Sequence, residues 1–172
     1  MYRKRLLVLC VLAATLGCSC AKVETELPAE MDVGEQTSFD EEKSLHIIDI
    51  SLAAMKTQTE NTSETKLAKI KRVIQRLEEQ GYAAIDSKNQ INMVCADQAI
   101  DFCQAVEEKR QDDFMLTVIS DTFQWIIYDF HCADGAVTVA RNIYQYEDGD
   151  MQLEESAVYT ASDWKYTAEG YI

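Results

Sequence analysis

The chain has 172 residues, enough for one domain with a single core once flanking segments are set aside. Thirty acidic residues against 16 basic ones give a formal net charge of −14. A charge this negative argues against a nucleic-acid partner, because affinity for nucleic acid comes mainly from neutralised phosphates. It argues equally against electrostatic docking on anionic lipid.

The first 17 residues combine a positively charged start with a short apolar run. Three basic residues at positions 3–5 precede 12 apolar or small residues that end at Gly17. A membrane span needs roughly 20 apolar residues, so this run fits a secretory signal peptide instead. The segment Thr15–Cys18 resembles the lipobox of bacterial lipoproteins, although Thr15 stands where leucine is usual. The resemblance implies cleavage before Cys18 and a diacylglyceryl group on its thiol; an ordinary cleaved signal peptide and an uncleaved anchor are the alternatives.

Residues 18–39 are predicted to form a flexible acidic tether. The segment shows no helical or strand periodicity and contains Pro28, the only proline of the chain. Such a segment buries too little apolar surface to offset its ordering entropy. A lipid on Cys18 would then be the partner that holds the domain, residues 40–172, at the extracytoplasmic face of the cell membrane.

The first helix is expected from about Asp40 to Thr57. Ser38, with Glu41 three residues later, resembles a capping box. An apolar stripe at helical spacing predicts the buried face, which consists of Leu45, Ile48, Leu52 and Met55.

Two further helices follow. The stretch "SETKLAKIKRVIQRLEEQG" ends at Gly81, which fits the left-handed position that closes a helix. Its expected apolar face is Leu67, Ile70, Val73, Ile74 and Leu77. Its basic residues would form a ridge on the other side, either a docking surface or a solvated face. A third helix from about Asp97 to Arg110 is expected to bury Ala99, Phe102, Cys103 and Val106.

The remaining chain predicts strands. "YAAIDSKNQINMVC" is typical of two short strands around a turn at residues 87–90. Beyond Asp113, five runs are rich in β-branched and aromatic residues: Phe114–Ser120, Phe123–Cys132, Ala136–Tyr146, Met151–Thr160 and Trp164–Ile172. Asp-Gly pairs at 134–135 and 148–149 favour two-residue hairpin turns. The predicted fold class is therefore α+β, with three helices packed on a curved antiparallel β-meander.

The first Asp-Gly turn also predicts which residues share a sheet face. It would pair Phe130 with Val139 and place an apolar set on the core side. The opposite face would mix aromatic and polar side chains, and its candidate ligand-binding residues are Trp125, Asp129, His131, Asn142 and Tyr144. The second Asp-Gly turn would add Leu153, Glu155, Ala157 and Tyr159 to that face. The alternatives are a half-solvated face, a surface for a small ligand or peptide, and acid–base chemistry by His131 with Asp129.

Cysteine usage and motifs favour no catalytic or metal centre. Cys95, Cys103 and Cys132 fit small buried side chains, although export would allow one disulfide with one thiol left over. Their spacing lacks the paired C-x₂-C of structural zinc sites. No nucleophile elbow, phosphate loop or H-E-x-x-H helix occurs. We therefore predict no metal and no cofactor.

The order of elements resembles the cystatin-like/NTF2-like superfold, in which helices pack on a curved antiparallel sheet. The superfold hosts both enzymes and binding modules, so it assigns no function. The lipobox, "LAKIKRVIQRLEEQGYAAID" and "DWKYTAEGYI" together resemble uncharacterised lipoproteins of Gram-positive bacteria that share a domain of unknown function. Such proteins continue past the last stretch, which predicts truncation after Ile172, and they carry no established active site to transfer.

Two functions follow as hypotheses. The first is a membrane-anchored extracytoplasmic module that binds an envelope protein, a peptide or a small molecule without catalysis. The alternative is an envelope hydrolase or isomerase that uses His131 and Asp129 in a sheet-lined pocket.

Overall fold

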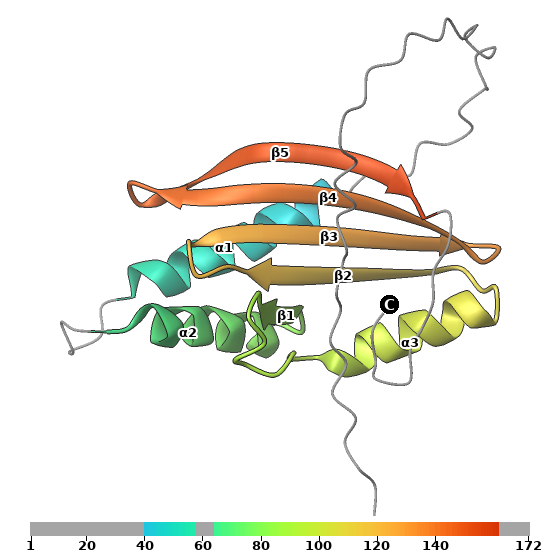
Figure 1. Ribbon diagram of the computed structural model, residues 1–172, viewed down its shortest axis with the longest axis horizontal. Coiled ribbons are helices and arrows are strands. Elements are labelled where there is room, and N and C mark those ends of the chain that lie inside the picture. The colour runs from blue at the N-terminus through green and yellow to red at the C-terminus, as the bar shows by residue number, and fades with distance from the viewer. Residues whose placement is uncertain (1–39, 58–63, 162–172) are drawn as a thin grey trace, which may run out of the picture.

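A computed structural model describes residues 40–57 and 64–161. The expected signal peptide (1–17), the lipidation site Cys18, the tether (18–39) and the expected strand Trp164–Ile172 lie outside the described residues. The elements in chain order are α1 (Glu41–Lys56), α2 (Lys66–Glu79), β1 (Ala83–Asp86), α3 (Ala96–Glu107), β2 (Asp112–Ile119), β3 (Gln124–Ala133), β4 (Ala136–Glu147) and β5 (Asp150–Thr160) (Figure 1). None of the described helices has the length and apolar character that a membrane crossing requires.

The five described strands form one open mixed sheet in the order β1-β2-β3-β4-β5. Strands β2 to β5 pair antiparallel with their chain neighbours, as the meander predicted. Strand β1 pairs parallel with β2, so the expectation of a purely antiparallel sheet is wrong. The cause is α3, which lies between the two strands in sequence and returns the chain to the end where β1 began. The α+β class is confirmed, whereas the cystatin/NTF2-like roll is not.

The expected hairpin at residues 82–95 is reduced to one strand. After β1, the second predicted strand contributes a single antiparallel bridge between Ala84 and Val94. Cys95 then takes a left-handed conformation with φ +49° and begins α3. The chain therefore turns into a helix before a second strand can extend.

Both Asp-Gly pairs form the predicted two-residue turns. Asp134 and Gly135 have φ values of +53° and +82°, and Asp148 and Gly149 have +51° and +87°. Positive φ at both central residues defines a type I′ turn, which matches the right-handed twist of the flanking strands. The β3–β4 register follows as predicted and pairs Phe130 with Val139.

The β4–β5 register departs from the prediction at a bulge. Tyr144 pairs with Leu153, but the next residue, Ile143, pairs with Glu155. One extra residue in β5 shifts the rest of the strand, and a one-residue shift moves side chains to the opposite face. The placement of Glu155, Ala157 and Tyr159 on the candidate ligand face is therefore wrong: Glu155 forms an ion pair with Arg141 on the other face.

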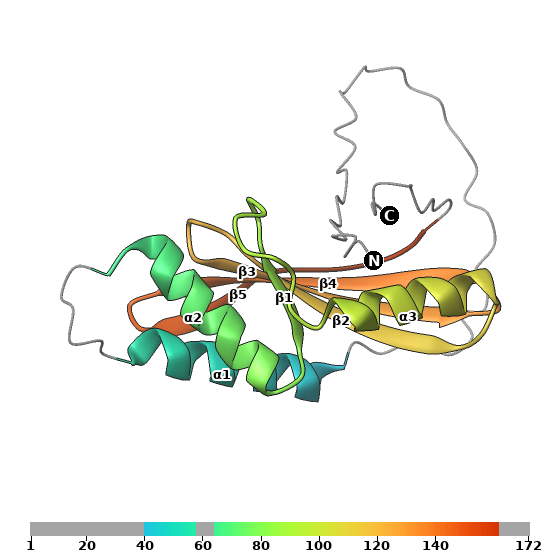
Figure 2. The same cartoon turned by 90° about the horizontal axis from the view of Figure 1, so that it is seen from below.

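The sheet carries a core on each face. One core joins α3 to the sheet through residues such as Phe102, Phe114 and Val139. The other joins α1 and α2 to the opposite face through residues such as Ile47, Ile74 and Trp125. Figure 2 shows the sheet nearly edge-on, with α1 along its lower side.

The helices follow the sequence pattern to different degrees. Helix α2 buries four of its five predicted apolar residues, leaving Leu67 exposed, and Gly81 follows it with φ +80°. Helix α3 buries the predicted set, including Cys103. Helix α1 is rotated from the prediction: Leu45 is exposed, and the buried residues are Ser44, Ile47, Ile48, Ser51 and Ala54. Asp40 is the N-cap and accepts from the Lys43 amide at 3.0 Å, whereas Ser38 of the expected capping box lies outside the described residues.

Candidate functional site

The sheet face predicted to hold a ligand is covered by α1 over its central part. Trp125 is fully buried, and its indole N–H donates to the hydroxyl of Ser51 on α1 at 3.1 Å. Asn142 and Tyr144 on the neighbouring strand are also buried. These three predicted residues do share a face, but the face is the second core and not an open or half-solvated surface.

Asp129 lies on the same face, at the start of α1. Its carboxylate accepts a hydrogen bond from the backbone N–H of Asp40 at 2.9 Å. Burial raises the pKa of Asp129 above its ordinary value of 3.8, the hydrogen bond from Asp40 opposes this rise, and the nearby charges of Asp40 and Asp113 add to it. Asp129 therefore ties the first residues of α1 to the middle of β3.

His131 follows two residues later on β3 and contacts a different partner. Its Nδ1 is hydrogen-bonded to the carboxylate of Asp113 on β2, its direct cross-strand neighbour. The predicted pairing of His131 with Asp129 is not what the structure shows. Among the hydrogen bonds of the described residues, no hydroxyl or thiol contacts His131. A histidine–carboxylate pair can move a proton, but this one has no hydroxyl or thiol nucleophile bound to it.

Charged side chains complete the cluster around the start of α1. Lys43 forms an ion pair with Asp40 at 2.9 Å. The hydrogen bond from the Lys43 amide lowers the pKa of Asp40 most, and the hydrogen bond from the Lys43 side chain lowers it further. The same side-chain hydrogen bond raises the pKa of Lys43. Both groups are partly exposed to solvent, so the pair adds little stability. The cluster fixes where α1 begins.

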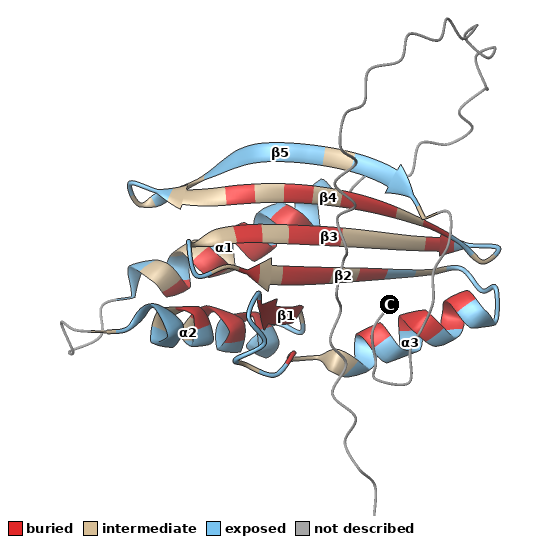
Figure 3. Ribbon diagram, in the orientation of Figure 1, coloured by how far each residue is buried: buried red, intermediate tan, exposed pale blue. Residues whose placement is uncertain are grey.

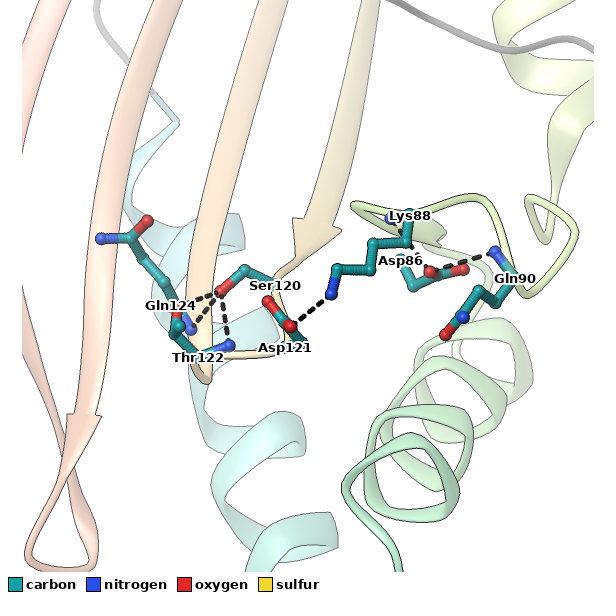
Figure 4. A network of polar contacts seen from close by, with 7 residues as sticks. All are labelled: Asp86, Lys88, Gln90, Ser120, Asp121, Thr122 and Gln124. Carbon is teal, nitrogen blue, oxygen red and sulfur yellow. Dashed lines mark hydrogen bonds and ion pairs between the residues drawn. The ribbon is translucent and has the colours of Figure 1, made fainter.

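A shallow hollow lies at the other end of the domain, between the start of α2 and two loops. Its volume is about 200 Å³, and it is lined by Lys66, Leu67, Ile70, Asp86, Ser87, Lys88, Gln90, Ile119 and Asp121. The buried carboxylate of Asp86 accepts from three backbone amides of the loop after β1, those of Lys88, Gln90 and Ile91, at 2.6 to 3.1 Å. Figure 4 shows Asp86 with Lys88 and Gln90. Asp86 is thereby satisfied within its own loop.

The two loops of this hollow are joined by one ion pair. The ammonium group of Lys88 lies 2.5 Å from the carboxylate of Asp121 in the β2–β3 turn (Figure 4). Within that turn, the hydroxyl of Ser120 accepts from the amides of Thr122 and Gln124. Lys66 lies 5.8 Å from the ring centre of Phe123, within cation–π range. The sequence signals this hollow only through the Ser-Lys-Asn-Gln turn at residues 87–90, which predicted a hairpin and no site.

The cysteines of the described residues are unpaired. Cys95, Cys103 and Cys132 are free thiols, with Cys103 and Cys132 buried. Burial raises the pKa of Cys103 to about 11, so its thiol is a poor nucleophile near neutral pH. No set of three or more potential metal-ligating side chains gathers in the part of the chain that the structure describes.

The geometry defines an α+β domain with an open mixed sheet covered by helices on both faces, and comparison with known proteins places it in a family. Residues 38–172 match the family of unknown function DUF6070, and the chain belongs to that family. No curated protein matches the chain. No solved structure matches it either.

Proposed function

We propose that this protein is a lipid-anchored lipoprotein of the extracytoplasmic membrane face and that its domain is a non-catalytic binding module. One observation carries the second part: the two side chains that acid–base chemistry would use are engaged in other contacts. Asp129 holds the start of α1, and His131 pairs with Asp113. The likeness to uncharacterised Gram-positive lipoproteins supports the first part, and element order alone supports a relation to NTF2-like binding modules.

The anchor is the diacylglyceryl group on Cys18. The charged start, the short apolar run and Gly17 before Cys18 favour processing at this position. One acyl chain gives only marginal membrane binding, whereas two chains at about 0.8 kcal/mol per buried CH₂ give stable anchoring. A chain with a net charge of −14 needs such an anchor, since that charge repels anionic lipid.

Fatty-acid labelling with membrane fractionation tests the anchor. Cys18→Ala should abolish label incorporation and leave either an unprocessed precursor or a released protein. Cys20→Ala is the matched control and should change neither label nor location. Label and membrane retention that persist in Cys18→Ala would contradict the lipoprotein assignment.

Cross-linking in intact cells, followed by purification from membranes, tests the binding role. His131→Ala removes the acid–base candidate without touching α1, so the binding module predicts an unchanged set of cross-linked partners. A chemical turnover that purified protein performs and His131→Ala abolishes would refute the non-catalytic assignment.

A further inference from the structure

Strand β5 is the outer strand of the sheet and is exposed along almost its whole length. It pairs with β4 on one side, and no described strand pairs on its other side. Figure 3 shows the contrast between β5, which is almost entirely pale, and β2, β3 and β4, in which buried and intermediate residues predominate. An edge strand offers unpaired backbone donors and acceptors to any extended chain of suitable side chains.

The backbone hydrogen bonds show which β5 amides face outward. The N–H of Ala161 donates to the carbonyl of Val137 at 2.8 Å, so this residue faces β4. Amides alternate along an antiparallel strand, so the outward-facing residues beyond the bulge are Ser156, Val158 and Thr160. The backbone amides of these three alternate residues can therefore pair with an added strand.

Apolar side chains flank this edge. Leu153 and Val158 are 55% and 60% exposed, and they sit beside Tyr144 and Ala140 on the sheet face that α1 covers. Leu153 and Val158 therefore place two exposed apolar side chains along the edge.

The charge along the edge is of one sign. Five carboxylates occur between positions 147 and 155: Glu147, Asp148, Asp150, Glu154 and Glu155. Strand β5 contains no lysine, arginine or proline, the residues that commonly protect an edge. Glu155 pairs with Arg141, and Glu154 accepts from Gln124 at 3.0 Å, which leaves the strand acidic overall.

This charge decides between two kinds of occupant. Two copies of this chain, each with a net charge of −14, repel one another, which disfavours a dimer that pairs along this edge. A partner strand with lysine or arginine at alternate positions would instead meet complementary charge.

We propose that the outer edge of β5, which no described strand occupies, binds an extended segment of a partner protein in which basic residues alternate with apolar ones, by adding a strand to the sheet. Main-chain pairing with Ser156, Val158 and Thr160 would supply affinity, and Glu154, Leu153 and Val158 would select the side chains. The inference rests on the proposed binding role and adds to it the site and the chemistry of the partner.

The test measures fluorescence anisotropy of a labelled synthetic peptide of alternating lysine and valine with the full-length protein. Two control peptides separate the contributions: one carries glutamate in place of lysine, and one keeps every lysine but is N-methylated on every amide, so neither of its edges can donate backbone hydrogen bonds to a strand. The lysine peptide should bind at least about tenfold more tightly than either control. Equal binding of the methylated peptide would show non-specific charge attraction and overturn the proposal.

Two proline variants locate the binding edge. Ser156→Pro removes only an outward amide, so the sheet should persist while peptide affinity falls at least about tenfold. Ala157→Pro removes an amide that pairs with β4 and should lower thermal stability, which confirms the assignment of inward and outward residues. Three results would overturn the proposal. The first is undiminished binding of the lysine peptide by folded Ser156→Pro. The others are a β5-dependent dimer in sedimentation equilibrium and peptide binding that appears only after residues 162–172 are deleted. These failures leave the cross-linked partners of the proposed function unaffected, so the two claims are tested separately.

Discussion

Two serines on α1 offer a matched test of how this helix is held on the sheet. Ser44 and Ser51 are both fully buried and lie seven residues apart on one helix face. The hydroxyl of Ser51 accepts from the indole N–H of Trp125, whereas the hydroxyl of Ser44 has no protein partner among the described residues. The same substitution at the two positions should therefore have opposite effects.

Serine to alanine gains about 0.5 kcal/mol of helix propensity at either position. At Ser51 the change also leaves the buried indole N–H of Trp125 unsatisfied, which costs about 1–3 kcal/mol. We expect Ser51→Ala to lower the free energy of unfolding by about 1–2 kcal/mol. At Ser44 the change removes an unpaired buried hydroxyl, so Ser44→Ala should be neutral or stabilising by about 1 kcal/mol.

Urea denaturation followed by circular dichroism gives both midpoints, and the slope shows whether two-state behaviour is kept. The difference between the variants should be about 2 kcal/mol, because the shared propensity gain cancels in the comparison. Equal shifts in both variants would show that the Trp125 hydrogen bond does not distinguish the two serines. Our account of how α1 is held on the sheet would then be wrong.

Three further predictions concern single groups. Gly149→Val should destabilise the domain by about 1–2 kcal/mol, because Gly149 has φ +87°, which a β-branched residue resists even though a Cβ there would meet no atom within 4 Å. Gly149→Asn should cost less, because asparagine tolerates positive φ. Equal thermal midpoints for the parent and both variants would contradict the type I′ turn. The thiol of Cys103, buried and with its pKa raised to about 11, should react with a thiol reagent only at the rate of unfolding, and rapid labelling of the native protein would contradict this. The raised pKa of Asp129 means that the folded state binds its proton more tightly than the unfolded state, so this group lowers stability as pH rises above 3.8. Asp129→Asn should therefore gain stability relative to the parent between about pH 4 and 7, as measured by urea midpoints at both ends, and a constant gap would contradict the assignment.

Local patterns predicted the parts of the fold that local physics controls. The Asp-Gly pairs defined both hairpins because positive φ at two adjacent residues is a property of the turn itself. The apolar stripe of α2 predicted its buried face because four bulky residues leave only one orientation with a dry core. The β3–β4 register followed from the turn without further information.

Tertiary contacts decided the rest. The rotation of α1 was missed because a polar residue is expected on the exposed face of a helix, whereas Ser44 and Ser51 are both buried. Trp125 provides a hydrogen-bond partner for Ser51. The candidate ligand face was expected to be open because its strands mix polar and apolar residues, but nothing in that alternation shows that a helix covers it. The bulge near Glu155 has no glycine or other local signal in the sequence.

The contact between Asp129 and the backbone of Asp40 also has a mechanical consequence. If the chain before residue 40 is fixed to a membrane, any pull on the domain is transmitted to the first residue of α1. Force at one end of a helix that lies along a sheet detaches its contacts in sequence, beginning with this hydrogen bond and reaching Ser51 and Trp125 only later. The domain should therefore yield to load by peeling α1 while the hairpins of β2 to β5 remain paired, and a single-molecule pulling trace should show one short extension before the main unfolding event.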